Sequence, residues 1–389
     1  MGMEAAKVSE SLEKQVVAWY EALHRYPELG LQETKTSGLI RKALQEMDGM
    51  LVSRPTPTGV MAVLRGGRPG RTIAFRADID ALPVQEQTGS PNASAVPGVM
   101  HACGHDGHVA MLLGAAKLLS EKRQELCGEL RFLFQPAEEI AAGACEMISA
   151  GVLEGVDEVY GAHLDVLHPA GTFGVREGPL MASAYTLSIR IHGRGGHAAF
   201  PHTAVDSVYI AAQVILALHG MMSRSVNAFH RAVLTIPQVQ ASGASNVMAE
   251  TVTLGGTVRV LDPACEEMIF LKIEQVARGI CQANGAGCTV EWKCGCPALC
   301  NPTAEYRFVC GVLEDRFGGG CVYEDEPVMG GENFSEFLKV LPGCYYKVGA
   351  APADGKGFPH HNPQFHFDPA ALRYGVEACA AVLEAAAAR

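Results

Sequence analysis

The feature that most restricts the fold of this sequence is a change of pattern near residue 181 and a return to the first pattern near residue 295. In the outer parts, short apolar runs such as TIAFRAD (72–78) and EVYGAHLD (158–165) alternate with helical stretches such as 108–122. Short apolar runs bounded by Gly, Pro or Asp are typical of strands that are buried on both faces. The alternation of strands and helices therefore indicates an α/β sheet covered on both sides.

The middle segment has a different organisation. It reads as strand, helix, strand, strand, helix, strand, and its second helix starts at Pro263. This order within about 110 residues is the split β-α-β pattern of ferredoxin-like domains. We therefore predict a discontinuous α/β catalytic domain with a central mixed sheet at residues 1–180 and 295–389, and an inserted ferredoxin-like α+β domain at residues 181–294.

Composition excludes several classes of protein. The net charge of −11 and the pI near 5.7 disfavour nucleic acid as a partner, because phosphate binding needs a basic face. No apolar run reaches the length of a membrane span, and no secretory signal pattern precedes the thirteen cysteines, so we expect a cytoplasmic protein with reduced thiols. Cys294, Cys296 and Cys300 match no paired CxxC spacing, which favours buried or incidental thiols over a second metal site.

One short stretch, HACGHDGH (101–108), concentrates side chains that bind transition metals. Cys103 and His105 are two residues apart, so a loop before a helix can turn both toward one centre. In open α/β sheets the ligand crevice lies at the carboxyl ends of the strands, so acidic and imidazole side chains that follow expected strands should converge there. These side chains are those of Asp78, Asp80, Glu138, Glu139 and His163.

The chemistry of these side chains favours a hydrolytic metal site. Thiolate, imidazole and carboxylate together suit zinc, manganese or cobalt. From an extended segment, the neighbouring Glu138 and Glu139 cannot both point at the metal. We predict that one is a ligand and that the other acts as general base toward a water whose pKa the metal lowers. This division of roles is what hydrolysis of an amide requires.

Other interpretations of the same residues remain. Cys103 could be a nucleophile with His105 or His108 as its base, but that mechanism leaves the two glutamates unexplained. The chain could also be a catalytically silent metal-binding protein, although such proteins typically lose ligands. We expect His101 and His108 to be structural. The stretch GRGGHAAFPH (193–202) could be a turn with two incidental histidines.

Nine stretches that run in order across almost the whole chain resemble the amidohydrolase branch of the co-catalytic metallo-aminoacylase and carboxypeptidase family. They are HRYPELGLQE, RADIDALP, MHACGHDGHVAMLLGAA, FQPAEE, GAHLD, GRGGHAAFPH, GTVRV, GGENFS and HHNPQFHFD. That branch includes hippurate hydrolases, auxin–amino acid conjugate hydrolases and N-acyl amino acid deacylases. The resemblance implies a zinc-peptidase-like catalytic domain, an inserted lid and dimerisation domain, and hydrolysis of small N-acyl amino acids. A metallopeptidase of small dipeptides is the alternative.

The resemblance also implies a centre of two divalent metal ions per subunit, which could be Mn, Zn, Co or Ni. Glu138 stands where the family has its general base. Asp80 would orient a metal ligand from behind, a contact that metal-bound histidines commonly require. The positions that match the family's ligands are Cys103, His105, Glu139, His163 and His361.

In the inserted domain, His197 stands where related enzymes have a histidine that reaches the active site of a partner subunit and stabilises the oxyanion. We therefore expect a homodimer or a dimer of dimers. Asn246 and Arg259 resemble lid residues that hold the substrate carboxylate. Three positions depart from the usual pattern without touching a proposed ligand. Asn333 stands where Asp is common, Ala249 stands where Pro is common, and Ser207 stands where a Pro often follows the preceding Asp206.

Overall fold

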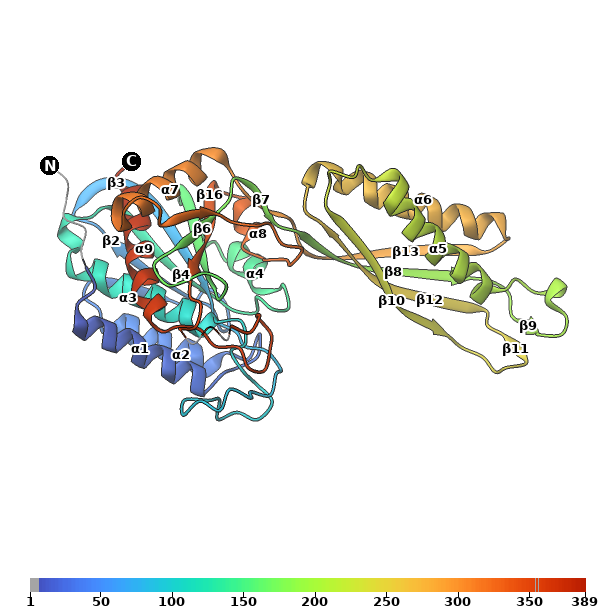
Figure 1. The fold of residues 1–389 in the computed structure, drawn as a ribbon, viewed down its shortest axis with the longest axis horizontal. Helices are drawn as coiled ribbons and strands as arrows, with labels where there is room; N and C mark the ends of the chain where they lie inside the picture. The colour runs from blue at the N-terminus through green and yellow to red at the C-terminus, as the bar shows by residue number, and fades with distance from the viewer. Residues whose placement is uncertain (1–6, 354, 356) are drawn as a thin grey trace. The chain divides into compact units, whose positions relative to one another are not determined.

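A computed structural model describes residues 7–353, 355 and 357–389; the side chain of Cys294 lies outside the described part. The described chain forms two compact units (Figure 1). The first comprises the chain up to Gly178, Cys300–Glu326 and the chain from Asn333 onward. The second comprises Pro179–Leu299 and Pro327–Glu332. Each unit contains its own cluster of buried apolar side chains, so each has its own core.

The first unit is built on an eight-stranded mixed sheet in the order β1-β2-β4-β3-β5-β16-β6-β15. The central strands β4, β3, β5 and β16 run parallel, whereas β2 and β6 pair antiparallel with their central neighbours. β5 is buried along almost its whole length, as expected for a strand covered on both faces. The strands are β1 (Met50–Ser53), β2 (Val60–Arg65), β3 (Arg68–Asp78), β4 (Cys127–Gln135), β5 (Glu158–Asp165), β6 (Phe173–Val175), β15 (Val322–Glu324) and β16 (Gly343–Gly349).

Helix α3 is the central helix of this unit. It is buried over almost every turn, and it packs against α1, α9 and strand β3. α1 begins at a capping residue, Ser9, whose hydroxyl accepts a hydrogen bond from the amide of Leu12. Among the described residues, no helix is both long and apolar enough to cross a membrane. The helices are α1 (Glu10–Arg25), α2 (Thr34–Gln45), α3 (His105–Glu121), α4 (Gly143–Ser149), α7 (Thr303–Phe317), α8 (Ser335–Leu338) and α9 (Ala370–Ala387), with a 3-10 turn at Arg123–Glu125.

The structure differs from the sequence-based expectation at two places that matter for the site. The stretch 101–108 was expected to be a loop with His108 entering the helix, but α3 already begins at His105. Gly104 permits this early start because its φ of 86° turns the chain sharply in the left-handed region. β16 was not identified from the sequence, and it lies between β5 and β6.

The second unit consists of a four-stranded antiparallel sheet in the order β10-β12-β8-β13 and two helices, α5 and α6, which lie on one face of it (Figure 1). The chain order β8, α5, β10, β12, α6, β13 is the predicted ferredoxin-like order. The buried side chains of α5 and α6 form one cluster with those of the sheet. The elements are β8 (Ser183–His192), α5 (Ser207–Ser225), β10 (Ala232–Ala241), β12 (Thr251–Val260), α6 (Glu266–Ala283) and β13 (Gly287–Cys296), with the short strands β9 (Gly196–His197) and β11 (Val247–Met248). Two further short strands, β7 (Gly178–Met181) and β14 (Leu299–Asn301), pair with each other and are divided between the units, with Cys300 and Asn301 in the first.

Candidate metal centre

The structure brings all five predicted metal ligands of the first unit together. Their donor atoms fall into overlapping groups whose members lie within 4.8 Å of one another. One group is formed by Cys103, His105 and His163, and a second by Cys103, Glu139 and His361. Cys103 belongs to both of these groups, and His105 links the first of them to a further group with Glu138 and Glu139.

The hydrogen bonds of two imidazoles leave the correct nitrogen free for a metal. Nδ1 of His105 lies 2.9 Å from the carbonyl oxygen of Asp80, and Nδ1 of His163 lies 2.8 Å from that of Leu164. A carbonyl oxygen only accepts, so both Nδ1 atoms carry the proton and both Nε2 atoms keep a lone pair. Nε2 of His163 lies 3.5 Å from the Cys103 sulfur, which places this lone pair at the centre.

Asp80 holds two ligands at once. One of its carboxylate oxygens lies 3.2 Å from Nδ1 of His105, and the other accepts a hydrogen bond of 2.9 Å from the amide of Glu139. Both side chains of the pair Asp80–His105 are buried, so the contact is shielded from water. This is the position that the sequence analysis predicted for a residue that orients a ligand from behind.

His361 reaches the centre from the loop before α9. Its amide donates a hydrogen bond of 2.8 Å to the carbonyl oxygen of Ala102, directly beside Cys103. Its φ of +68° lies in the left-handed region, which residues other than Gly rarely adopt. Such strain persists where the surroundings hold the backbone in place, and it is common at functional sites.

The donor atoms fit a bound divalent metal. Oε1 of Glu139 is buried and has no hydrogen-bond partner among the described residues, although it lies 3.4 Å from Nε2 of His361. A buried carboxylate oxygen without a partner is costly, and a cation at this point would satisfy it. Sulfur, nitrogen and carboxylate oxygen together suit a borderline metal ion such as zinc or manganese.

The pKa shifts of the donors differ in direction. Burial opposes protonation of His105, but the Asp78 carboxylate outweighs it and raises the pKa of His105, and the hydrogen bond to Glu139 raises the pKa of His361. Burial raises the pKa of the Cys103 thiol and lowers the pKa of His163. Burial opposes ionisation of Glu139 as well, but the neighbouring His361 outweighs it and the pKa of this carboxyl is lowered. Neutral imidazole and ionised carboxylate are the forms that bind metals, and a buried thiol ionises when a cation lies beside it.

One expectation about the glutamate pair is wrong. Glu138 and Glu139 were expected not to face the same point, yet each offers an oxygen to one group with His105. The reason is that the segment after β4 is not extended: Ala137 has a φ of +52°, and a turn follows. Glu138 is held by a hydrogen bond of 3.2 Å from the amide of Asn333 to its Oε1.

His108 has the structural role that was expected of it, and Asp78, expected at this edge of the sheet, is the residue that holds it. Nδ1 of His108 lies 2.6 Å from Asp78, and its Nε2 accepts a hydrogen bond of 3.0 Å from the amide of Leu164. His108 therefore fixes the end of β5 next to His163, as a structural residue of the site. The only signal in the sequence was that Asp78 and Asp80 both follow the same strand.

His24 was missed altogether. Its Nδ1 lies 2.6 Å from Asp106 in the first turn of α3, and its Nε2 lies 3.4 Å from Glu86. His24 thus ties α1 to the start of the ligand-bearing helix. Its place in the motif HRYPELGLQE was the available signal, but the contact joins residues 82 positions apart.

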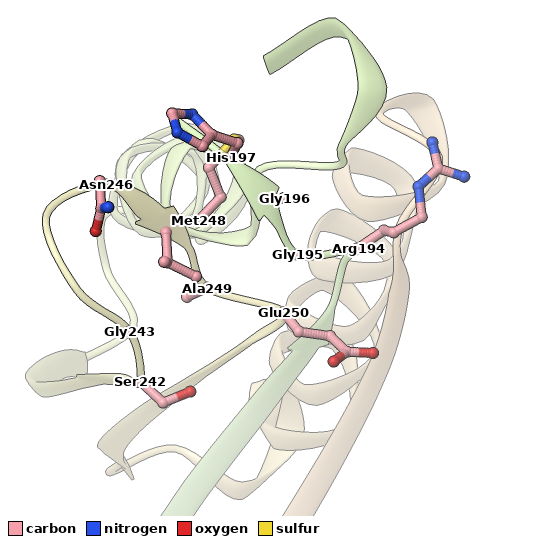
Figure 2. A pocket seen from close by; sticks show the side chains of 11 residues that line it. Arg194, Gly195, Gly196, His197, Ser242, Gly243, Asn246, Met248, Ala249 and Glu250 are labelled. Carbon is pink, nitrogen blue, oxygen red and sulfur yellow. The ribbon is translucent and has the colours of Figure 1, made fainter. Parts of the chain in front are cut away.

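The predicted residues of the second unit do not all meet. His197 and Asn246 line a pocket of about 640 Å³ (Figure 2). The amide of Ala198 donates a hydrogen bond of 3.0 Å to the carbonyl oxygen of Asn246. Arg194 belongs to the same lining but points away from His197 in Figure 2. Arg259 is not among the residues that line this pocket; it lies near the far end of β12, a ten-residue strand that spans about 30 Å.

Comparison with known proteins identifies the family. Residues 74–385 match the peptidase family M20/M25/M40. The chain belongs to this family. It is 45% identical over 284 residues to an N-acyl-L-amino acid amidohydrolase of Geobacillus stearothermophilus, covering 73% of this chain and 77% of that protein. It is 40% identical over 367 residues to an N-acetylcysteine deacetylase of Bacillus subtilis, and the match covers 93% of this chain and 95% of that protein.

A solved structure supports the same assignment to the M20/M25/M40 family. It is a Bacillus subtilis protein described as a dinuclear metal-binding peptidase of family M20, with a TM-score of 0.86, 35% identity and coverage of 96% of this chain and 98% of that chain. The predicted family, the α/β fold and the class of metal-dependent amide hydrolases are thereby confirmed. That protein is described as binding two metal ions, and the first unit of this chain holds clustered donor groups that could form such a centre.

Proposed function

We propose that this member of the M20/M25/M40 family hydrolyses the amide bond of small N-acyl amino acids. The observation that carries the proposal is the pair of donor groups that share Cys103, beside which Glu138 offers a further carboxylate. The relatives named as an N-acyl-L-amino acid amidohydrolase and an N-acetylcysteine deacetylase support this substrate class. The proposed ligands are Cys103, His105, Glu139, His163 and His361.

The residues of the chain divide the work of hydrolysis between them. Metal ions bound in this site would supply Lewis acidity, which polarises the scissile carbonyl and acidifies water. Glu138 accepts the proton of the attacking water on its carboxylate and delivers it to the leaving amine. His197 donates a hydrogen bond to the developing oxyanion. Asn246 binds the carboxylate of the substrate from the pocket with His197. Arg259 lies outside that pocket and would bind the same carboxylate from the other subunit.

The proposal is tested with a panel of N-acyl amino acids that carry acetyl, benzoyl, indoleacetyl and longer acyl groups, with small dipeptides in the same panel. The protein is stripped with a chelator and reloaded with manganese, zinc, cobalt or nickel. We expect hydrolysis of N-acyl amino acids only after reloading. Preference for dipeptides would favour the metallopeptidase alternative, and hydrolysis of nothing by the reloaded protein would refute the proposed function.

We also propose a homodimer in which the second unit of one subunit serves the active site of its partner. The pocket that contains His197 is lined only by residues of the second unit. The exposed face of α5 carries Tyr209 and Leu216, which are 61% and 75% exposed. β10 is an edge strand with Val233 and Val239 exposed, and such an edge is a template for pairing with another chain. A second copy that covers this surface accounts for both features.

The compartment is a further proposal. Among the cysteines whose side chains are described, nine are free thiols, including the buried Cys344 and Cys379. Free thiols in this number are typical of a reducing environment. We place the enzyme in the cytoplasm on this ground; isolation of the protein with disulfides already formed would contradict that placement.

A further inference from the structure

We propose that Arg76 and Asn333 are positioning residues that hold Glu138 in place relative to the metal ligands. The inference extends the proposed function and rests on it, because Glu138 is the proposed general base. Arg76 and Asn333 are each only 1% exposed, although neither is a proposed metal ligand. They lie 257 positions apart in the chain and are joined by a direct hydrogen bond.

Arg76 is fixed by three side chains. Its Nε donates to Gln135 at 2.8 Å, and its two terminal nitrogens donate to Asp78 at 2.7 Å and to Asn333 at 2.9 Å. The guanidinium is planar and its donors have fixed directions, so three such contacts define its orientation. A buried charge without these partners would be strongly unfavourable, which makes the cluster rigid.

Asn333 transmits this orientation to Glu138. Its Oδ1 accepts from Arg76 and also from Nε2 of Gln135 at 3.0 Å, so its amide group cannot rotate without losing both contacts. In this orientation Nδ2 lies 3.5 Å from the carbonyl oxygen of Glu138, and the backbone amide of Asn333 lies 3.2 Å from Glu138 Oε1. Both the main chain and the carboxylate of Glu138 therefore contact one residue.

The other end of the cluster reaches a metal ligand. Asp78 lies 2.6 Å from Nδ1 of His108, whose Nε2 accepts from the amide of Leu164 at 3.0 Å. The carbonyl oxygen of Leu164 in turn accepts from Nδ1 of His163. A continuous chain of hydrogen bonds, buried in its middle and partly buried at both ends, thus connects the ligand His163 with Glu138. Its consequence is a fixed distance between the base and the site where the water binds, and small errors in such a distance reduce rates steeply.

The test compares two substitutions at position 333. Asn333→Leu keeps the approximate size of the side chain and the backbone amide, but it removes Oδ1, which accepts from Arg76 and Gln135. Asn333→Asp keeps an acceptor oxygen at this position. With metal content measured in each sample, we expect Asn333→Leu to lower kcat by about 10- to 100-fold while KM stays within about twofold. Asn333→Asp should restore most of kcat. If Asn333→Leu does not fold, Asn333→Ala removes the same contacts and leaves room for water.

A matched control separates positioning from stability. Asn301 is an equally buried asparagine of the same unit, which donates to the carbonyl oxygens of Arg176 and Tyr345. Asn301→Leu should lower the melting temperature as Asn333→Leu does, but leave kcat per metal-loaded protein unchanged. A kcat that falls equally in both variants would reduce Asn333 to a structural role and overturn the inference.

A double-substitution experiment decides whether Asn333 acts through Glu138. In a Glu138→Gln background we expect Asn333→Leu to have no further effect on the residual rate, because the group that it positions is already gone. A further loss of the full 10- to 100-fold would overturn the positioning role. The single substitutions separate the inference from the proposed function. If Glu138→Gln is inactive but Asn333→Leu retains the wild-type kcat, the inference fails and the proposed function stands. If Glu138→Gln retains full activity, the assignment of Glu138 as the base is wrong.

Discussion

At the scale of single residues, the site depends on which ring nitrogen of each ligand histidine donates a hydrogen bond to the protein and which is left for the metal. The carbonyl oxygens of Asp80 and Leu164 take the Nδ1 protons of His105 and His163, and so direct both Nε2 atoms to the centre. The spacing of Cys103 and His105 in the sequence could predict that they share a site, but these carbonyl contacts could not be predicted. They depend on how β3 and β5 end, which only the fold determines.

The role of Asp80 leads to a prediction about metal affinity. Asp80→Ala removes a carboxylate contact of His105 and the acceptor for the amide of Glu139. Substitution of such a supporting residue typically weakens metal binding by about 10- to 100-fold. Competition with a chromogenic chelator measures this directly, and the variant should reach wild-type metal content only at higher metal concentration. Wild-type affinity would show that Asp80 does not orient the ligands.

His24 leads to a prediction about pH. Burial opposes its ionisation, but Asp106 and Glu86 outweigh burial and raise the pKa of His24 to about 10. Because the folded pKa exceeds the unfolded value of about 6.5, the charged pair stabilises the fold fully below that value and loses this contribution as the pH rises through about 10.

The comparison is with His24→Gln, which cannot carry the charge. The difference in free energy of unfolding between wild type and variant should be largest near neutral and mildly acidic pH and should shrink toward about pH 10. Burial also opposes ionisation of Glu86, but His24 outweighs it and lowers the pKa of Glu86 to about 2, so that partner stays ionised throughout this range. Urea unfolding across the range measures the difference. A difference that does not change with pH would contradict the charged state of His24.

At the scale of elements, the start of α3 and the ends of the strands determine the site. The alternation of strands and helices was sufficient to predict β3, β4, β5 and α3, because each has a strong local pattern. β16 was not predicted although Pro342 precedes it and Gly bounds it at both ends, because Lys347 interrupts its apolar run. The contact between Arg76 and Asn333 was also beyond prediction, because it joins residues that are distant in the chain.

Gly107 in the first turn of α3 gives a prediction at this scale. A Cβ at this position would lie 2.6 Å from Cδ1 of Leu164 and 2.9 Å from Cζ of Phe367, both of which are buried. Gly107→Ala should therefore lower the free energy of unfolding by about 1–3 kcal/mol, and it should weaken metal binding because Leu164 adjoins His163.

The control for this substitution is Gly279 on α6, where a Cβ would meet nothing within 4 Å. Gly279→Ala should be stabilising by roughly 0.5–1 kcal/mol, as expected for Gly in a helix interior. Both values come from denaturant unfolding. Equal effects of the two substitutions would mean that close packing at Gly107 does not determine the position of α3.

At the scale of the whole molecule, the chain contains two units with separate cores, and the proposed residues are divided between them. The metal donors all belong to the first unit, whereas His197, Asn246 and Arg259 belong to the second. The sequence predicted both architectures from their different strand and helix orders. It did not predict which surface of the second unit would be apolar, because that depends on how α5 packs on its sheet.

The proposed dimer gives the prediction at this scale. Leu216→Asp places a charge on the exposed apolar face of α5 and should shift the protein from dimer to monomer in light scattering, with a loss of activity. Leu271→Asp is the control, because Leu271 is also exposed, at 53%, but lies on α6. Mixed dimers of His197→Ala and Glu138→Gln subunits should regain partial activity. A fully active Leu216→Asp monomer would contradict the proposal that His197 serves a partner subunit.

The most direct test of the central claim is the activity of Glu138→Gln at a metal content equal to that of the wild type. The substitution keeps the size of the side chain and removes the carboxylate that takes and returns the proton. We predict that hydrolysis of N-acyl amino acids falls by about 10²- to 10⁴-fold, the usual contribution of a general acid–base residue, while both metal ions remain bound. Undiminished hydrolysis by the metal-loaded variant would contradict the account.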